Sequence, residues 1–264
     1  MNLGTSGKRA LISGSTKGIG LATARALLNE GCVVTSNGHT ESGVNQAHAA
    51  LRAECPAARV HGIVADLGGA AGCDQAIQVL PEVDIMVNSL GIFEAKPFGQ
   101  ISDADWMKFF EVNVLSGVRL FRHYVNGMRS RNWGRIVFIS SESALQIPTE
   151  MIHYGTTKTE VLAVSRGLAE TLAGTAVTVN AVLPGPTASE GVGAMLAQEA
   201  KARKLDAKVV DGEFFAKARA SSIIQRFTQP AEVAAMIAYV CSAQALGSTG
   251  AALRVDGGVV RAIA

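Results

Sequence analysis

The residues with the clearest chemical use are a tyrosine and a lysine four positions apart, Tyr154 and Lys158. In a helix this spacing puts both side chains on one face, with their Cβ atoms about 5–6 Å apart. A nearby cation lowers the pKa of a phenol from about 10, so that its proton exchanges more easily near neutral pH. The pair therefore predicts a general acid and base, with a chance pairing on a solvated helix face as the alternative.

Two polar residues upstream strengthen this interpretation. Ser141 lies at the end of the strand-like run IVFISS, where open α/β sheets place their ligand crevice. Asn113 lies in EVNV within a helical stretch, a poor place for asparagine unless its side chain has a partner. Ser141 and Tyr154 would together offer two hydrogen-bond donors to a carbonyl oxygen that gains negative charge during hydride transfer.

A glycine-rich loop, SGSTKGIG at 13–20, lies between a predicted strand and a predicted helix. Gly14, Gly18 and Gly20 allow a tight turn and a close approach of the backbone to a pyrophosphate. The N-terminus of the following helix would offer free N–H groups to that anion. Glycines also serve turns for structural reasons, but the strand–loop–helix context favours dinucleotide binding.

Short β-rich apolar runs alternate with longer helical patterns along the chain. Strands are expected near 8–13, 31–36, 59–65, 83–87, 134–140, 175–182 and 251–255, and helices near 18–30, 41–54, 71–79, 103–130, 154–173 and 230–242. This alternation predicts an α/β fold: a doubly wound, Rossmann-type parallel sheet of about seven strands, with helices on both faces in three layers. We expect one domain over 1–264, with a substrate lid at 186–226; a solvated helical insertion is the alternative.

Composition excludes several other classes of protein. With 264 residues and 48% hydrophobic content, the chain can form one sizeable core. The net charge of +2 is too small to predict a nucleic-acid or membrane partner. Histidines and cysteines show no metal-binding or disulfide spacing, so no metal is expected. The N-terminus resembles no signal peptide, and the apolar stretch 233–246 is too short to span a bilayer. A cytoplasmic location is therefore expected.

Taken in order, these motifs resemble the single-domain short-chain dehydrogenase/reductase family over essentially the whole chain. The shared motifs are SGSTKGIG, Asp66 in VAD, NSLG at 88–91, EVNV, the serine of ISS, YxxxK, PGPT at 184–187 and RVDGG. The branch with the greatest similarity is that of bacterial 3-oxoacyl-[acyl-carrier-protein] reductase-like proteins. Here NSLG replaces the usual NNAG, and Glu142 follows the serine. Glu142 is expected to be a surface acid; the alternative is that it tunes the site.

The resemblance implies a role for each matching residue. Tyr154 would be the general acid in reduction and the base in oxidation, and Lys158 would lower its pKa and bind the nicotinamide ribose. Ser141 would hydrogen-bond the substrate oxygen, and Asn113 would hold a water that links Lys158 to solvent. The implied cofactor-binding residues are Gly14, Ser15, Thr16, Lys17, Gly18, Ile19, Gly20, Asn37 and His39, Asp66 and Leu67 at the adenine, Asn88 and Gly91 at the adenosine, and Tyr154, Lys158, Pro184, Gly185 and Thr187 around the nicotinamide.

The end of the second strand bears on the choice of cofactor. An acid at this point usually binds the ribose 2′-hydroxyl of NAD, but residues 36–40 contain none, and Glu41 comes late. NADP is therefore favoured over NAD, with Lys17 and His39 as the positive groups for the 2′-phosphate. His39 stands where the branch has arginine, and an imidazole is mostly neutral at pH 7.

The sequence thus predicts an NAD(P)H-dependent oxidoreductase that interconverts a carbonyl and a secondary alcohol. A non-catalytic NADP-binding sensor or scaffold of the same fold is the alternative, although such a protein need not keep the Ser–Tyr–Lys set. The substrate is expected to be small and largely apolar. Its candidate walls are Phe93, Leu145, Ile147, Ile152, Met195 and Phe214. Apolar residues on several faces of 103–130 and 154–173 predict a homo-oligomer, either tetramer or dimer.

Overall fold

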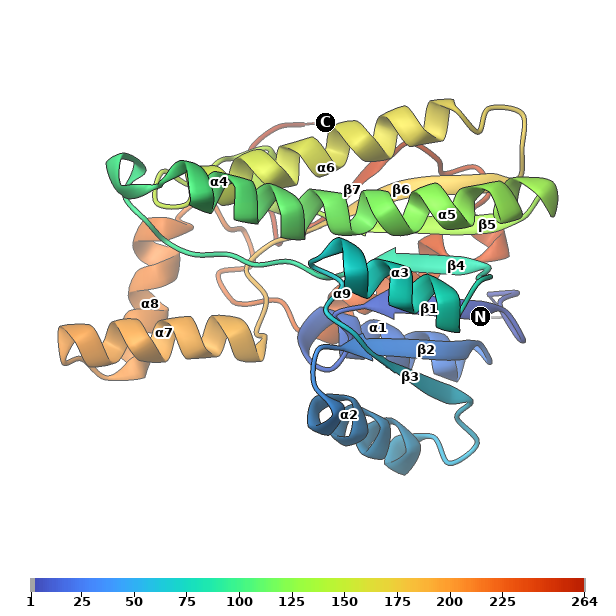
Figure 1. Ribbon diagram of the computed structural model, residues 1–264. Coiled ribbons are helices and arrows are strands. Elements are labelled where there is room, and N and C mark those ends of the chain that lie inside the picture. The colour runs from blue at the N-terminus through green and yellow to red at the C-terminus, as the bar shows by residue number, and fades with distance from the viewer. Residues whose placement is uncertain (1–2, 264) are drawn as a thin grey trace.

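The computed structural model describes residues 3–263. Its strands form a single seven-stranded parallel sheet in the order β3-β2-β1-β4-β5-β6-β7 (Figure 1). The strands are β1 (Arg9–Ser13), β2 (Val33–Gly38), β3 (Val60–Val64), β4 (Ile85–Asn88), β5 (Gly134–Ile139), β6 (Val177–Pro184) and β7 (Ala252–Val255). The central strands β5 and β6 are buried along their whole length. Their continuous apolar and β-branched runs follow from having both faces of the sheet covered.

Helices cover both faces of the sheet, and side chains alternate between two cores. Leu11 packs in one cluster, while its neighbours Ala10 and Ile12 pack in the other. The Ala10 side is covered by α1 (Gly18–Asn29), α2 (Glu41–Glu54) and α9 (Pro230–Val240), and the Leu11 side by α3 (Ala70–Val79), α4 (Asp103–Phe110), α5 (Ser116–Ser130) and α6 (Ile152–Glu170). The predicted three-layer, doubly wound fold is confirmed.

The strand order reverses between β1 and β4, which lie side by side. At the carboxyl end of this pair, the Ser13 hydroxyl donates to Asn88 Oδ1 at 2.7 Å. The same hydroxyl accepts from the backbone N–H groups of Ser89 and Leu90. Open α/β sheets bind ligands at such a reversal, and these bonds hold the two loops that border it.

The stretch predicted as helical over 103–130 is helical throughout, although it is not one regular α-helix. A π-helical turn at Glu111–Leu115 separates α4 from α5 and contains Asn113. The wider turn lets the Asn113 side chain reach inward, where it is 1% exposed. Single π turns within helices are often found at functional sites.

The 186–226 segment is largely helical. It holds α7 (Glu190–Arg203), α8 (Ala207–Glu213) and a π turn at Phe214–Ala218, and α7 and α8 stand to one side of the sheet (Figure 1). Leu196, Ala200 and Val210 form a small core there, against which Phe214 and Phe227 pack. The segment is therefore not a purely solvated insertion.

Short 3₁₀ turns at Phe98–Gln100, Glu142–Ala144 and Ala243–Ala245 complete the secondary structure. Within residues 3–263, no helix has the length and apolar character needed to cross a membrane. The same residues contain no group of three or more metal-ligating side chains that could hold an ion.

Candidate active site

The glycine loop folds back on the first turn of α1. A Cβ atom on Gly20 would lie 2.4 Å from the Gly14 carbonyl oxygen, and Gly14 and Gly18 have φ values of +58° and +56°. Only glycine fits these positions without strain. No side chain caps the helix at Lys17, so its first N–H groups can meet an anion. This narrow, open-ended cradle fits the pyrophosphate of a dinucleotide.

Several residues of the predicted cofactor set hold the loop from beneath. Ser15 is buried, and its hydroxyl donates to the Ile12 carbonyl at 2.7 Å. Asn37 is 2% exposed; it accepts from Gly14 N at 3.2 Å and donates to the carbonyls of Ile63 and Ala65. Sequence reasoning did not anticipate that this asparagine ties β2 to the glycine loop and to β3.

The residues predicted for the adenosine half fall into two groups. Lys17, His39 and Asp66 are exposed, and Thr16 is half-buried beside Gly38. Leu67 and Asn88, in contrast, are buried, Leu67 within the apolar core. Their side chains are therefore turned inward, and a ligand would meet only their backbone.

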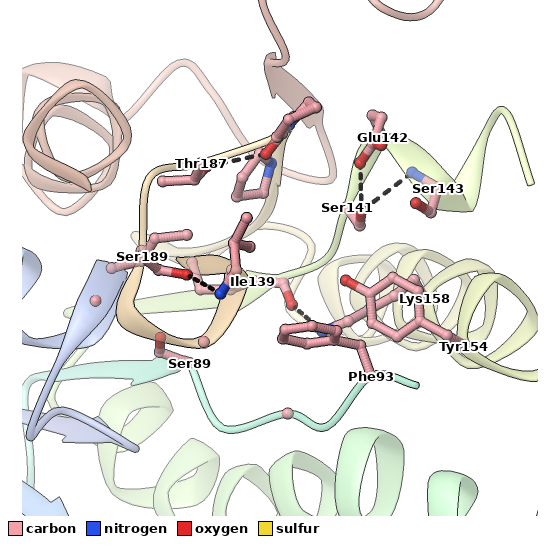
Figure 2. Close-up of a pocket in the computed structure, with 18 of the residues that line it drawn as sticks. Ser89, Phe93, Ile139, Ser141, Glu142, Ser143, Tyr154, Lys158, Thr187 and Ser189 are labelled. Carbon is pink, nitrogen blue, oxygen red and sulfur yellow. Dashed lines mark hydrogen bonds between the residues drawn. The ribbon is translucent and has the colours of Figure 1, made fainter. Parts of the chain in front are cut away.

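Tyr154 and Lys158 project from the first turns of α6 into the same cavity as Ser141 (Figure 2). The helix is fixed to the end of β5 because the Ser140 hydroxyl donates to the Lys158 carbonyl at 2.8 Å. The Lys158 ammonium is buried; it donates to the Ile139 carbonyl at 2.9 Å and lies 5.6 Å from the centre of the Tyr154 ring. The predicted one-face arrangement of the pair is observed.

The electrostatics differ from the expectation of a lowered phenol pKa. Burial raises the pKa of the Tyr154 hydroxyl above its usual value, although a hydrogen bond with Ser141 opposes this. Burial also lowers the pKa of Lys158 to about 8. The expected lowering of the Tyr154 pKa by Lys158 is not seen in the protein without cofactor, because burial raises this pKa and the cation that lowers it is Arg219. Tyr154 is held protonated, as a proton donor must be.

Asn113 braces the wall opposite Tyr154. Its Oδ1 accepts from Ile92 N at 2.8 Å, while its Nδ2 donates to the Ile92 carbonyl and to Thr157 Oγ1, both at 3.0 Å. Thr157 in turn donates to the Tyr154 carbonyl. A Cβ atom on Gly91 would lie 3.3 Å from the Lys158 ammonium. Glycine at this position therefore lets the backbone lie close to the ammonium.

Glu142 is not a surface acid, and that expectation is wrong. It is 4% exposed, its Oε2 accepts from the Ser141 hydroxyl at 2.6 Å, and its Oε1 accepts from Arg219 Nε at 3.0 Å. Arg219, which follows the π turn of the 186–226 segment, is itself buried. The sequence carried no signal for this contact, because a single arginine in a polar segment has no distinctive spacing.

One pocket connects these parts. Gly14, Lys17, Gly18, Ile19 and Gly20 line it together with Ser89, Gly91, Ser141, Tyr154 and Lys158. Pro184, Gly185 and Thr187, predicted to flank the nicotinamide, also line it. The residues of the 186–226 segment that line it beyond these are Pro186, Ser189, Glu190, Gly191, Val192, Met195, Phe214 and Arg219.

The predicted substrate walls are partly correct. Phe93, Met195 and Phe214 line the pocket, and Phe93 meets the Tyr154 ring edge-on at 6.3 Å between centroids. Leu145, Ile147 and Ile152 do not line it, since the chain after Ser141 turns away through the 3₁₀ turn. Met151, Val192 and Phe227 take part instead. The cavity thus has a polar centre and mostly apolar outer walls.

A protonated phenol, a serine and a buried ammonium beside a dinucleotide-type cradle can support proton transfer coupled to hydride transfer. Comparisons with known proteins agree. The sequence model described as short chain dehydrogenase matches residues 8–200. This chain belongs to the short chain dehydrogenase family.

Relatives cover the whole chain. It is 44% identical to the uncharacterized oxidoreductase YvaG of Bacillus subtilis, over 100% of both chains. It is 31% identical to the 3-oxoacyl-[acyl-carrier-protein] reductase FabG of Aquifex aeolicus, over 98% of this chain and 100% of the relative. The structure of L-sorbose reductase from Gluconobacter frateurii, complexed with NADPH and L-sorbose, matches with a TM-score of 0.92 at 29% identity over 100% of both chains.

These relatives confirm the predicted family and reaction class. The chain is an NAD(P)-dependent oxidoreductase of the short chain dehydrogenase family that acts on CH–OH groups of small molecules. The FabG relative fits the expected reductase-like branch, while the L-sorbose reductase has a different substrate. The relatives therefore do not single out one branch.

Burial of Lys158 has a measurable consequence for stability. Its pKa of about 8 lies below the ordinary 10.5, so the unfolded chain binds more protons between these values and stability rises with pH there. Below pH 8 the buried charge costs about 3 kcal/mol. Lys158→Met should therefore raise the Tm of the cofactor-free protein at pH 7, and the gain should vanish near pH 10.5. Thermal unfolding across this range measures it; a Tm lowered at pH 7 would contradict the assignment.

Proposed function

We propose that this protein is an NADP-dependent oxidoreductase that interconverts a small carbonyl compound and its secondary alcohol, with Tyr154 as the proton-transfer group. The observation that carries the proposal is the single pocket that joins the glycine loop to Ser141, Tyr154 and Lys158. When bound, the cofactor supplies or accepts the hydride. The protein's residues then have to hold both reactants and move one proton.

Each side chain has a part in that work. Tyr154 gives its proton to the substrate oxygen in reduction and takes it back in oxidation, while Ser141 hydrogen-bonds that oxygen or the Tyr154 hydroxyl. Lys158 binds the nicotinamide ribose and restores the proton on Tyr154. Asn113 is proposed to keep one lone pair on Oδ1 for a water, since within residues 3–263 that oxygen accepts one bond, from Ile92 N, and it can accept two.

The substrate proposed for this pocket is small and largely apolar. Phe93, Met151, Val192, Met195 and Phe214 supply its outer walls. An acyl-carrier protein as the substrate carrier is less well supported, because Arg203 in the last turn of α7 is already paired with Glu199 at 2.9 Å and with Glu213. The 186–226 segment, which forms one side of the pocket, is proposed to act as the substrate lid.

A non-catalytic sensor is disfavoured by the intact and converging catalytic set. We place the protein in the cytoplasm, consistent with its four free cysteines, three of them buried.

Replacing Tyr154 by phenylalanine tests the catalytic role. Tyr154→Phe removes the transferable proton and leaves the ring against Phe93. We expect kcat to fall by at least about 100-fold, the usual contribution of general acid catalysis. NADPH affinity should stay within twofold. NADPH oxidation against a ketone panel and fluorescence titration measure these, with the exposed Tyr239→Phe as the matched control. Retention of more than a few per cent of wild-type kcat would overturn the role.

Cofactor choice rests on charge at the adenosine end. Lys17 and His39 are both exposed there, and a charge-assisted hydrogen bond contributes about 1.5–3 kcal/mol, or ten- to a hundredfold in affinity. NADPH should thus exceed NADH in kcat/KM. Lys17→Ala should erode the ratio and His39→Arg should raise it, while the exposed Lys108→Ala should leave it unchanged. If the wild type prefers NADH, the lack of an acidic residue at 36–40 does not indicate a preference for NADP.

We also propose a homo-oligomer, a tetramer or a dimer. A mostly apolar groove lies between α5 and α6; Val118, Phe121, Val125, Val164 and Leu168 line it, together with Arg122 and Asn126. Burying such a groove against a second copy would remove it from water. Sedimentation equilibrium should show a dimer or tetramer for the wild type and dissociation for Val164→Glu. A wild type that stays monomeric at every concentration tested would refute the proposal.

A further inference from the structure

A buried carboxylate directly follows the proposed catalytic serine, and the proposed reaction gives it no task. Glu142 Oε2 lies 2.6 Å from the Ser141 hydroxyl, a distance typical of a hydroxyl that donates to a carboxylate. Both residues are buried and both line the active-site pocket. The carboxylate is therefore in direct contact with a group that would meet the substrate.

This contact fixes the direction of the Ser141 hydroxyl. A serine hydroxyl has one proton and two lone pairs. The proton goes to Glu142, and one lone pair accepts from Ser143 N at 3.1 Å. The remaining lone pair is left for the hydroxyl of Tyr154 or of an alcohol substrate. In the protein without substrate the Ser141 proton thus points to Glu142, whereas the sequence predicted Ser141 as a donor to a carbonyl oxygen.

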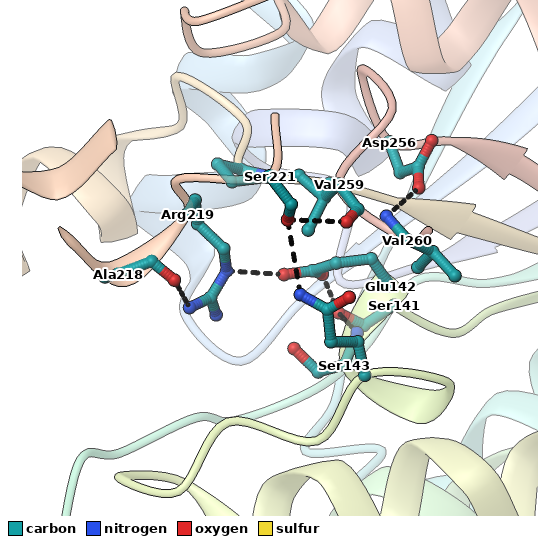
Figure 3. A network of polar contacts seen from close by, with 12 residues as sticks. Ser141, Glu142, Ser143, Ala218, Arg219, Ser221, Asp256, Val259 and Val260 are labelled. Atoms are coloured by element: carbon teal, nitrogen blue, oxygen red, sulfur yellow. Dashed lines mark hydrogen bonds and ion pairs between the residues drawn. The ribbon is translucent and has the colours of Figure 1, made fainter. Parts of the chain in front are cut away.

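Glu142 is in turn held by the 186–226 segment. Arg219 Nε donates to Glu142 Oε1 at 3.0 Å, and Arg219 Nη1 donates to the Ala218 carbonyl at 2.8 Å (Figure 3). Two residues further on, the Ser221 hydroxyl donates to the Val259 carbonyl at 2.6 Å. Arg219 Nη1 also lies 3.5 Å from Oε1 of the exposed Glu150, so the arginine faces two carboxylates, of which Glu142 is the buried one.

Ion pairs buried in this way contribute little stability compared with apolar side chains of similar size. Stability therefore gives little reason for the pair. We propose that Glu142 is a positioning residue: it fixes the place of the Ser141 hydroxyl beside Tyr154 and the substrate, and Arg219 holds the Glu142 carboxylate in place. This inference rests on the proposed function of Ser141 and Tyr154.

A double-mutant cycle in kcat separates positioning from a structural role. Glu142→Gln keeps the shape of the side chain but weakens the acceptor, so kcat should fall about tenfold, as expected for the loss of one charged hydrogen bond. KM and NADPH affinity should stay within twofold. In a Ser141→Ala background the same substitution should change kcat by less than twofold, since there is no hydroxyl left to position. Glu82→Gln, which removes the acid of an exposed pair with Arg9 far from the pocket, is the matched control and should leave kcat unchanged.

Equal losses in both backgrounds, or no loss in either, would overturn the inference. If the wild type does not catalyse the proposed reaction, or if Ser141→Ala does not lower its rate, the proposed function fails first. The inference then fails with it. If Glu142→Gln does not fold, Arg219→Lys gives a second route. It keeps the charge but loses the Nε donor, so kcat should fall only when Ser141 is present.

Thermal unfolding tests the arginine without any substrate. Arg219→Met leaves an unpaired buried carboxylate, whereas Arg219→Met combined with Glu142→Gln removes both charges. The double variant should therefore have a higher Tm than Arg219→Met alone. A double variant with the same or a lower Tm would show that the two charges do not depend on each other.

Discussion

The active site depends on a lysine ammonium held out of water at the end of β5. Lys158 donates to the Ile139 carbonyl, and its position is fixed by the bond from the Ser140 hydroxyl to its own backbone. An isolated charge in such a place is costly, and Gly91 leaves space beside the ammonium. The π turn brings Asn113 inward to Ile92 and to Thr157, the neighbour of Lys158 in α6.

The features that were predictable from sequence are those determined by neighbouring residues. The strands follow from continuous apolar runs, the glycine loop from its place between strand and helix, and the Tyr154–Lys158 face from helical spacing. Asn37 and Leu67 show the limit, because a motif identifies a position and leaves open whether the side chain faces the ligand or the core. The π turn was likewise not predictable, because its helical pattern matches that of α4 and α5.

The Glu142–Arg219 pair could not be found from sequence at all. The two residues lie 77 positions apart, and either alone resembles an ordinary surface charge. Only the docking of the 186–226 segment over the end of β5 brings them together. In consequence, the segment proposed as the substrate lid also contacts the group next to Ser141, so the proposed lid and the proposed catalytic serine share one set of bonds.

We propose that hydride and proton transfer meet in the pocket between the glycine loop and Tyr154. Single-turnover reduction of an apolar ketone with NADPH deuterated at the transferable C4 position tests it most directly, with mass spectrometry of the product. The account predicts an alcohol with one deuterium on the former carbonyl carbon from the wild type, and almost no product from Tyr154→Phe. Deuterium transfer at equal rates in both proteins, or a product without deuterium, would contradict it.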